Sequence, residues 1–556
     1  MAVKLTSATA IGLILASNPA LAEVTPQSVW ERLSDYYETV GMTVETGSVD
    51  DSGDRLTVND VIISQDSEKG STEFDMGQFV LSANDDGSVA VDLPDEFSGV
   101  ITMEYPEADA QHTGDSPSGD SVSDDSLDGA EDAAEAGDDA SEMAGEADTA
   151  EPQQMPLDAS NVPQGPTKIN FTVRLQDDSM TVSEDGESTV YDYDIPVVEA
   201  VVDRIEMLDG TTVEAPLRLT MNDITGTDRF SESDGTSVGQ SGTIASLDVK
   251  FAFGDEAAGG AVDGSATING LTIKSQSFIP ADANLGEDIA AAMRAGLDVS
   301  GTFGFESMET NGEINATDPA EAGSFSSTNE QGEITFAMAG GHLAYGGRFG
   351  PAQIEAQGGN LPGPVSYGAE NTEASVEVPV MASDEPQDFI AVYSLQGVEL
   401  SDSLWSLFDP QSALPRDPAS VNIDIDGTAV LDLDLLDDQA FAESPSAEVG
   451  AFKTLSINDI SLSMLGADAQ LSGELSGLDV RETPAPVGSI SGRFEGLNGM
   501  IDALVQAGLV PENQVMAARM MMAMFAKADP ENPEVMTTEL EFREGGEIFA
   551  NGQQVK

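Results

Sequence analysis

The chain has no cysteine and only two histidines among its 556 residues. Without cysteine it has no disulfide, no thiolate metal ligand, no thiol nucleophile and no lipid-modified N-terminal cysteine. A zinc site with several histidines is not expected either, because His112 lies in a segment with no scaffold to position it. The fold must therefore be held by an apolar core. Hydrophobic residues make up 40% of the chain, which is enough to form one.

Basic residues are also scarce. Lys and Arg number 21 against 101 Asp and Glu, which gives a formal net charge of −80. Nucleic acids and anionic membrane surfaces are bound through basic groups, so we expect no nucleic-acid partner. The acidic residues are spread along the whole chain, which favours a hydrated, salt-tolerant surface over dedicated cation binding.

No apolar run approaches the ~20 residues of a membrane-spanning helix. The short run Ile11–Ala16 follows Lys4 and precedes Ala20–Ala22, the pattern of a signal peptide with small residues before the cleavage site. We therefore predict a cleaved signal peptide over residues 1–22 and no transmembrane span. The predicted location is the periplasm, with secretion into the medium as the alternative.

Composition divides the rest of the chain. Residues 23–105 combine one helix, predicted over 23–41, with several strands, and indicate a small α+β domain. Residues 106–165 are predicted to be a disordered acidic linker, since 107–151 hold sixteen carboxylates and no Phe, Tyr, Trp, Lys or Arg. Residues 166–556 indicate a β-rich domain, either single or in two lobes, 166–385 and 386–556.

Alternating apolar residues dominate the C-terminal region. Leu247, Val249, Phe251 and Phe253 form one such series. This pattern predicts a β-rich (α+β) fold of large curved antiparallel sheets, buried on one side and packed by a few helices. A motif of Asn followed by Asp or Gly recurs at Asn59, Asn222, Asn269 and Asn458. It predicts a strand–bulge–strand device, for which a repeating ligand groove is the alternative interpretation.

Three helical segments are predicted: one between an N-cap at Asp282 and Gly296, one over 403–408, and a C-terminal αα-hairpin of 497–508 and 512–527. The second hairpin helix is apolar nearly all round, with Arg519 the only charge between 515 and 526. We expect it to be a core helix. The alternative is a contact surface for hydrophobic cargo, formed by Met516, Met520, Met521, Met522, Met524 and Phe525.

Motifs for catalysis or metal binding are weak. Gly235–Gly239 matches Gly-x-Ser-x-Gly, but the strand before and the helix after that a nucleophile elbow needs are not evident. Asn422, Asp424 and Asp426 match the start of a calcium loop, but Leu433 occupies the place of its bidentate Glu. The flanking alternation favours a hairpin turning at Asp426–Gly427. We assign no catalytic residue, cofactor or metal.

Two stretches resemble one protein family. Trp405–Pro418 and Gly496–Val555, which includes the methionine-rich helix, are similar to the family called domain of unknown function 2125. The resemblance covers roughly the last 170 residues and, less closely, the N-terminal helix. It implies an exported envelope protein of Gram-negative bacteria and supplies no catalytic residue.

The sequence favours a non-catalytic, exported envelope protein, a scaffold or carrier for a hydrophobic partner such as a lipid or an unfolded outer-membrane protein. The alternative is a periplasmic hydrolase that uses a carboxylate pair or His342. The ligand, the occurrence of catalysis and the oligomeric state are not determined by the sequence.

Overall fold

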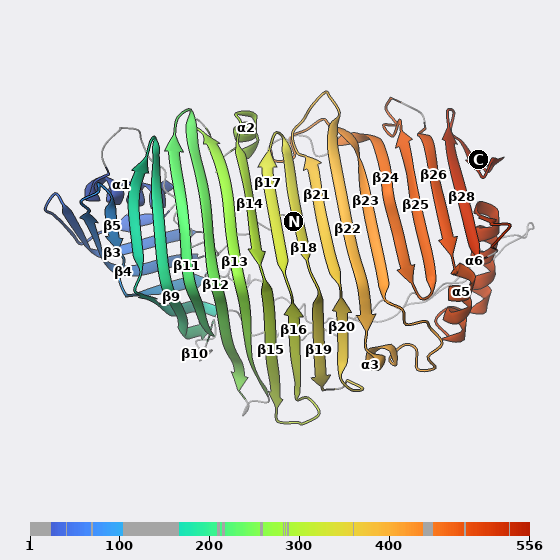
Figure 1. Ribbon diagram of the computed structural model, residues 1–556, viewed down its shortest axis with the longest axis horizontal. Helices are drawn as coiled ribbons and strands as arrows, with labels where there is room; N and C mark the ends of the chain where they lie inside the picture. Colours follow the sequence, from blue (N-terminus) through green and yellow to red (C-terminus); the bar gives the residue numbers. More distant parts are fainter. Residues whose placement is uncertain are drawn as a thin grey trace, which may run out of the picture.

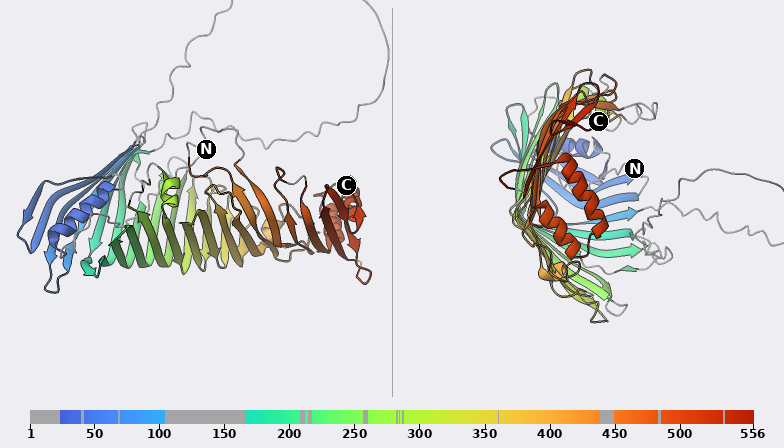
Figure 2. Two further views of the ribbon diagram at one scale, coloured as in Figure 1. Left: turned by 90° about the horizontal axis from the view of Figure 1, so that it is seen from above. Right: turned by 90° about the vertical axis from the view of Figure 1, so that its right-hand side faces the viewer.

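A computed structural model describes residues 24–39, 42–67, 70–103, 166–207, 212–213, 217–255, 260–281, 283, 285, 288–359, 361–437, 449–482, 485–532 and 534–556. In these residues 30 strands are hydrogen-bonded into one sheet, and they follow one another nearly in chain order (Figure 1). Figure 2 shows the sheet bent into an open crescent with a concave and a convex face. The prediction of a curved, antiparallel, β-rich fold with a few helices is confirmed.

The first part of the sheet joins the strands on both sides of residues 104–165. β6 pairs with β7 and β5 pairs with β8, so both parts belong to one sheet. Whether 23–105 or 166–556 folds alone stays a prediction. The strands are β1 Thr43–Glu45, β2 Ser48–Asp51, β3 Arg55–Ser67, β4 Gly70–Ala83, β5 Val89–Asp92, β6 Glu96–Met103, β7 Pro166–Gln176, β8 Ser179–Asp185, β9 Ser188–Met207, β10 Thr212–Val213, β11 Leu217–Glu232, β12 Gly235–Asp255 and β13 Gly260–Pro280.

The middle of the sheet has two tiers of shorter strands. One tier runs β14, β17, β18, β21 and the other runs β15, β16, β19, β20, and the long strands β13 and β22 pair with both tiers. The bounds are β14 Asp298–Phe305, β15 Ser307–Ala316, β16 Gly323–Asn329, β17 Gly332–Ala339, β18 His342–Phe349, β19 Ala352–Gly358, β20 Val365–Ala369, β21 Asn371–Pro379 and β22 Gln387–Leu400.

The C-terminal part continues as a simple meander from β22 to β26, followed by the helical hairpin and the last strands. Since β22 pairs with β21 and β23, the sheet also crosses the predicted lobe boundary at 385. The bounds are β23 Ala419–Leu431, β24 Gly450–Met464, β25 Ala467–Ser476, β26 Val487–Glu495, β27 Lys527–Ala528, β28 Val535–Arg543, β29 Glu547–Ala550 and β30 Gln553–Gln554.

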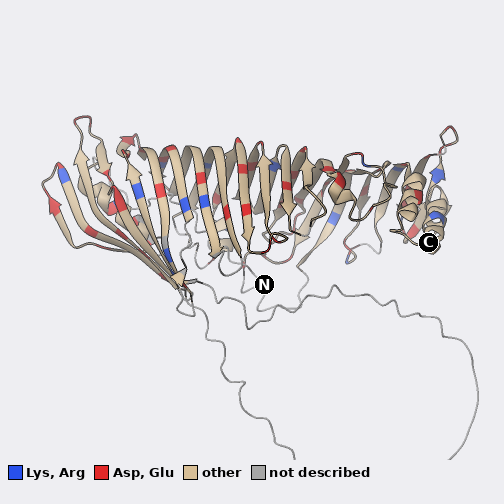
Figure 3. Cartoon of the chain, turned by 90° about the horizontal axis from the view of Figure 1, so that it is seen from below, with Lys and Arg blue, Asp and Glu red and all other residues tan. Residues whose placement is uncertain are grey.

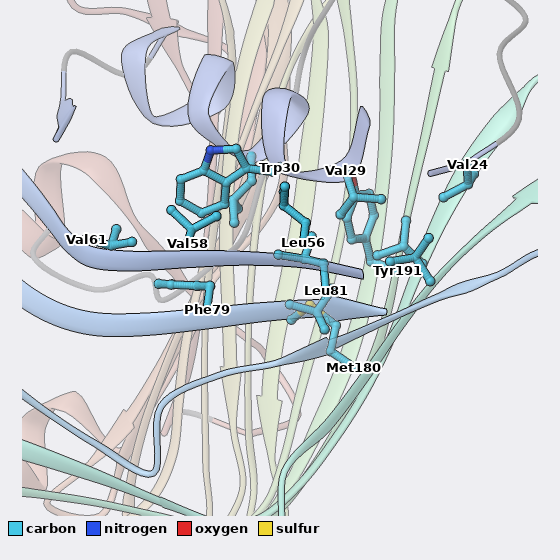
Figure 4. Close-up of a cluster of buried hydrophobic side chains, with 14 of the residues drawn as sticks. Val24, Val29, Trp30, Leu56, Val58, Val61, Phe79, Leu81, Met180 and Tyr191 are labelled. Atoms are coloured by element: carbon cyan, nitrogen blue, oxygen red, sulfur yellow. The ribbon is translucent and has the colours of Figure 1, made fainter. Parts of the chain in front are cut away.

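The predicted N-terminal helix is present as α1, Pro26–Thr39. Val29, Trp30 and Leu33 of α1 are buried against the concave side of the first strands, and the Trp30 ring lies 5.6 Å from that of Phe79 (Figure 4). Further core residues come from β8, β9, β11 and β12, among them Tyr191 and Val238. The largest buried cluster of the described chain therefore lies beneath α1 at the N-terminal end of the sheet.

The described residues contain four further helices. α2, Ile289–Arg294, begins after its N-cap Asp288 and is shorter than the helix predicted between Asp282 and Gly296; Asp282 itself lies outside the described residues. α3 is Asp402–Trp405. The predicted C-terminal hairpin is confirmed as α5, Leu497–Gln506, and α6, Glu512–Phe525. Figure 2 shows α1, α5 and α6 on the concave side of the sheet.

Left-handed residues interrupt several strands near their middle. Asp60, Asp223, Gly270 and Gly397 have φ between 49° and 64°. The first three belong to the Asn motifs, so the predicted strand–bulge–strand device is confirmed. Met221 and Ile224 are three positions apart on β11, yet both pack against the same buried cluster. The kink thus keeps apolar side chains on one face along the whole strand, although simple alternation would move them to the other.

One predicted hairpin is wrong. Asp426 and Gly427 lie inside the continuous strand β23, which pairs along its length with β22 and β24. Gly427 is the cross-strand partner of Phe389, and an added Cβ would come within 2.8 Å of its ring. The same Cβ would lie only 2.2 Å from the Thr454 carbonyl oxygen of β24, so glycine allows close approach to both neighbouring strands and does not form a type I′ turn.

Candidate functional site: the concave face

The two faces of the sheet have opposite chemistry. Directly paired residues of antiparallel strands share a face, so a face can be followed from strand to strand. One such row starts beneath α1 and extends to the middle of the sheet, which shows that its members lie on the concave face. It runs Val182, Tyr191, Asp228, Gln240, Ser275, Gly301, Phe336, Tyr345 and Val376.

From β14 to β26 this face has no charged side chain. Extending the register gives the residues that we call the apolar face. It spans eight inter-strand steps of about 4.8 Å, or roughly 38 Å. Its members are Val299, Gly301, Phe303, Phe305, Gly332, Ile334, Phe336, Met338, Leu343, Tyr345, Gly347, Phe349, Thr372, Ala374, Val376, Val378, Phe389, Ala391, Tyr393, Leu395, Val421, Ile423, Ile425, Gly427, Leu455, Ile457, Ile460, Leu462, Ala469, Leu471, Gly473, Leu475, Gly488, Ile490, Gly492 and Phe494.

The apolar face is open to solvent in its middle, whereas Val299, Met338, Leu343 and Val378 at its rim pack against the buried cluster of α2. Ile334, Phe336 and Tyr345 are 45%, 41% and 55% exposed, although each occupies a position that alternation predicts to be buried. The expectation that these strands are buried on one side is therefore wrong for the middle of the sheet. No layer of helices covers this face, and the described helices lie at its ends and rim. An uncharged, exposed apolar surface of this extent is typical of a binding surface.

Glycine–aromatic pairs flatten the concave face. In eight cross-strand pairs of the described residues, an added glycine Cβ would lie within 2.8 Å of the partner's ring. Because glycine has no Cβ, the ring can lie down across the neighbouring strand and need not stand upright. The pairs are Gly99–Phe171, Gly226–Tyr193, Gly264–Phe251, Gly301–Phe336, Gly312–Phe325, Gly332–Phe305, Gly332–Phe349 and Gly427–Phe389.

This device was not predicted from the sequence. The only signal is a glycine within an apolar stripe, as in Gly301-Thr-Phe303-Gly-Phe305, and the cross-strand partner cannot be known before the register is known.

A buried polar cluster marks the N-terminal end of the concave face. Asp228 and Tyr191 are each 2% exposed, and among the described residues neither Asp228 Oδ1 nor the Tyr191 hydroxyl has a hydrogen-bond partner. Burial raises the pKa of Asp228 to about 6, and it raises the pKa of Tyr193 to about 12. This polar cluster lies beneath α1, in the same row of paired residues that continues into the apolar face.

The convex face carries the charges. Arg348 Nε donates to Glu373 Oε1 on the neighbouring strand at 2.9 Å, and Thr227 donates to Asp192 at 2.6 Å. Acidic residues occur along the whole length of the sheet (Figure 3). This polar face keeps the outside of the crescent hydrated while the concave face stays uncharged.

The calcium-loop residues lie on the convex face of β23. Asn458 Nδ2 donates to Asp424 Oδ1 at 3.0 Å and to Asp426 Oδ2 at 2.6 Å. Asn422 donates to Asp459. An amide thus occupies the position between the two carboxylates where a cation would have to bind. Within the described ranges, no group of three or more His, Cys, Asp or Glu side chains could hold a metal ion.

The hydrolase candidates are not brought together. His342 begins β18 at a two-glycine turn, and its Nδ1 lies 3.2 Å from the Gly340 carbonyl oxygen. Ser237 lies within β12, paired with Ser231 and Phe278, and not at a nucleophile elbow. His112, the signal peptide and the acidic linker lie outside the described residues.

The methionine-rich helix is not a core helix. α6 has no buried residue, and Met516, Met520, Met521 and Met524 are 58–72% exposed. Met522 is half-buried and Phe525 is 39% exposed. The helix packs only one side against its surroundings, so the expectation of a core helix is wrong. None of the helices within the described residues is long and apolar enough to cross a bilayer.

Comparison with known proteins gives one match. Residues 282–548 match the family described as an uncharacterized protein conserved in bacteria, domain of unknown function 2125 (DUF2125). The match begins well upstream of the resemblance seen in the sequence and does not include α1. No curated protein and no solved structure was found to match the chain. The matched region runs from just before α2 to β29, so the part of the chain that is similar to the domain of unknown function 2125 family contains the whole apolar face and the C-terminal helices.

Proposed function

We propose that this protein is an exported, periplasmic carrier that shields the acyl chains of lipids on its apolar face. The observation that carries the proposal is the uncharged, solvent-exposed concave face from β14 to β26. Its removal from water by an acyl chain would contribute roughly 25 cal/mol per Å² of apolar area.

The backbone of the apolar face favours an acyl chain over an unfolded polypeptide. Strands β14 to β26 are paired on both sides, so their N–H and C=O groups already have partners in the sheet. An extended polypeptide on this surface would bury peptide groups without hydrogen bonds, at a cost of a few kcal/mol each. An acyl chain has no such groups, and the flat glycine–aromatic pairs give it a smooth surface.

The polar outside fits the proposed periplasmic location. A carrier must stay soluble in water while it holds an apolar ligand, and the charged convex face supplies that solubility. The predicted signal peptide supports export. Native mass spectrometry of protein taken from the periplasm, followed by lipid extraction, tests both the location and the ligand class.

Binding can be tested with a phospholipid that carries a fluorescent acyl chain. Ile334→Asp and Phe336→Asp place a carboxylate on the apolar face at exposed positions, so we expect both variants to fold and to bind the probe at least tenfold more weakly. The matched control is Thr335→Asp, which places the same charge on the convex face between them. Equal binding by all three variants, or no binding by the wild type, would overturn the proposal.

A further inference from the structure

We propose that the outer side of α6 docks the protein onto the surface of a lipid bilayer. At 3.6 residues per turn, Met516, Met520, Met521 and Met524 fall on one side of the helix, together with Ala517. The four methionines are 58–72% exposed. In the described part of the chain, this is an apolar helical surface that no other element covers.

The opposite side of the helix is the one held by the protein. Val515, Ala518 and Met522 are half-buried, and Arg519 donates to Asp502 of α5 at 2.5 Å. Arg519 is the only charged residue of α6 after Glu512, and its ion pair directs it away from the methionines. The exposed side is therefore uncharged over about three turns.

The hairpin is electrically neutral in a strongly acidic chain. Residues 496–528 contain two carboxylates, Asp502 and Glu512, and two basic residues, Arg519 and Lys527, whereas the whole chain has a net charge of −80. An anionic surface would be repelled by a bilayer that contains anionic lipid. A neutral hairpin can approach such a surface, and flexible methionine side chains adapt to disordered acyl chains.

The charge also argues against a second copy as the occupant. Two chains of −80 repel each other at low salt, and one helix side of four methionines offers a small area to offset that repulsion. Binding to a bilayer surface does not require a partner of complementary shape. Figure 1 places α5 and α6 beside β28 at the C-terminal end of the sheet, so docking would bring this end to the membrane.

Vesicle flotation tests the proposal, with the chain lacking residues 1–22 so that the signal peptide cannot contribute. We expect the protein to float with phosphatidylcholine vesicles, and also with vesicles containing one quarter phosphatidylglycerol. Replacing Met516, Met520, Met521 and Met524 by Gln should lower the bound fraction at least tenfold, because Gln keeps the length and helix propensity of Met but is polar. The same four positions changed to Leu should retain binding.

Circular dichroism and the unfolding midpoint establish that the variants fold. Ile334→Asp should float like the wild type, so failure of the carrier function and failure of docking give different results. Flotation of the Gln variant at the wild-type level, or none by the folded wild type, would overturn the proposal. So would a wild-type dimer that becomes monomeric in the Gln variant while neither floats.

Discussion

The Phe336 ring lies over Gly301 of the neighbouring strand, so close that a Cβ on Gly301 would come within 2.3 Å of it. The two residues are direct cross-strand partners at the centre of the apolar face. The arrangement lowers the ring onto the sheet and leaves its upper side free. Glycine is thus needed at this position to make room for the ring. The backbone does not require it, because the φ angle of Gly301 is one that any residue can adopt.

Gly301→Ala should destabilise the protein by roughly 1–3 kcal/mol, because the new methyl group displaces the ring. The matched control is Gly239→Ala, where an added Cβ meets nothing within 4 Å and the backbone is likewise extended. Its effect should be neutral or slightly stabilising. Urea unfolding of both variants measures the difference. Equal midpoints would show that the ring moves without cost.

Asp228→Asn should stabilise the protein at neutral pH. Burial raises the pKa of Asp228 to about 6, whereas an unfolded Asp titrates near 4. The folded state therefore binds more protons between these values, and the contribution of this group to stability falls as pH rises from about 4 to about 6. The gain for the variant should be about 2–3 kcal/mol at pH 7 and should vanish near pH 4.

The control for Asp228 is Asp192→Asn, an exposed position on the adjacent strand. It should show no comparable pH dependence. Urea midpoints measured at pH 4, 5, 6 and 7 decide the matter. A constant difference between Asp228→Asn and wild type across this range would contradict the assignment.

The sequence predicted the regular parts of this fold because alternation and capping are local. The 3.6-residue spacing of Val29, Leu33 and Tyr37 is sufficient to predict α1, and the Asn–Asp pairs are sufficient to predict the kinks at Asp60 and Asp223. The Asp426–Gly427 hairpin was wrong because pairing with two strands distant in the sequence, β22 and β24, outweighs the local turn signal.

The site was only half predictable, for a related reason. Alternation shows that one face of a strand is apolar, but not whether another layer covers it. Ile334 and Phe336 have the same pattern as buried strand residues, yet they are exposed because no second layer packs on the middle of the concave face. The same applies to α6, whose apolar character predicts burial only if the rest of the chain supplies a partner.

Asp479→Asn should lower the free energy of unfolding at neutral pH. It should also make that free energy fall less steeply as the pH is lowered. Asp479 is 3% exposed, and it accepts from Lys453 Nζ at 2.8 Å and from Arg481 Nε at 2.9 Å. The hydrogen bonds from Arg481 and Lys453 hold the pKa of Asp479 well below its usual range. Because the folded pKa is depressed, the stabilisation is present above about pH 4 and is lost as pH falls.

Thermal unfolding at pH 7, 5 and 3 checks this prediction. The midpoint of the wild type should exceed that of Asp479→Asn at pH 7, and the gap should narrow at pH 3. The exposed Asp384→Asn is the control and should follow the wild type at every pH. A gap that stays constant down to pH 3 would mean that the charge of Asp479 contributes nothing.

Asn458→Asp should convert a satisfied contact into a repulsive one. The Asn458 amide donates to both Asp424 and Asp426, so a carboxylate there would place three like charges together on the convex face. The cost should be about 1 kcal/mol at low ionic strength and should shrink with salt.

Millimolar calcium should restore the unfolding midpoint of Asn458→Asp, because three carboxylates supply the oxygen ligands that this cation binds. Asn315→Asp is the control, since Asn315 donates to a single carboxylate, Asp263, and its variant should respond less to calcium. Stabilisation of the wild type by the same calcium concentration would show instead that Asn458 does not exclude a cation from this site.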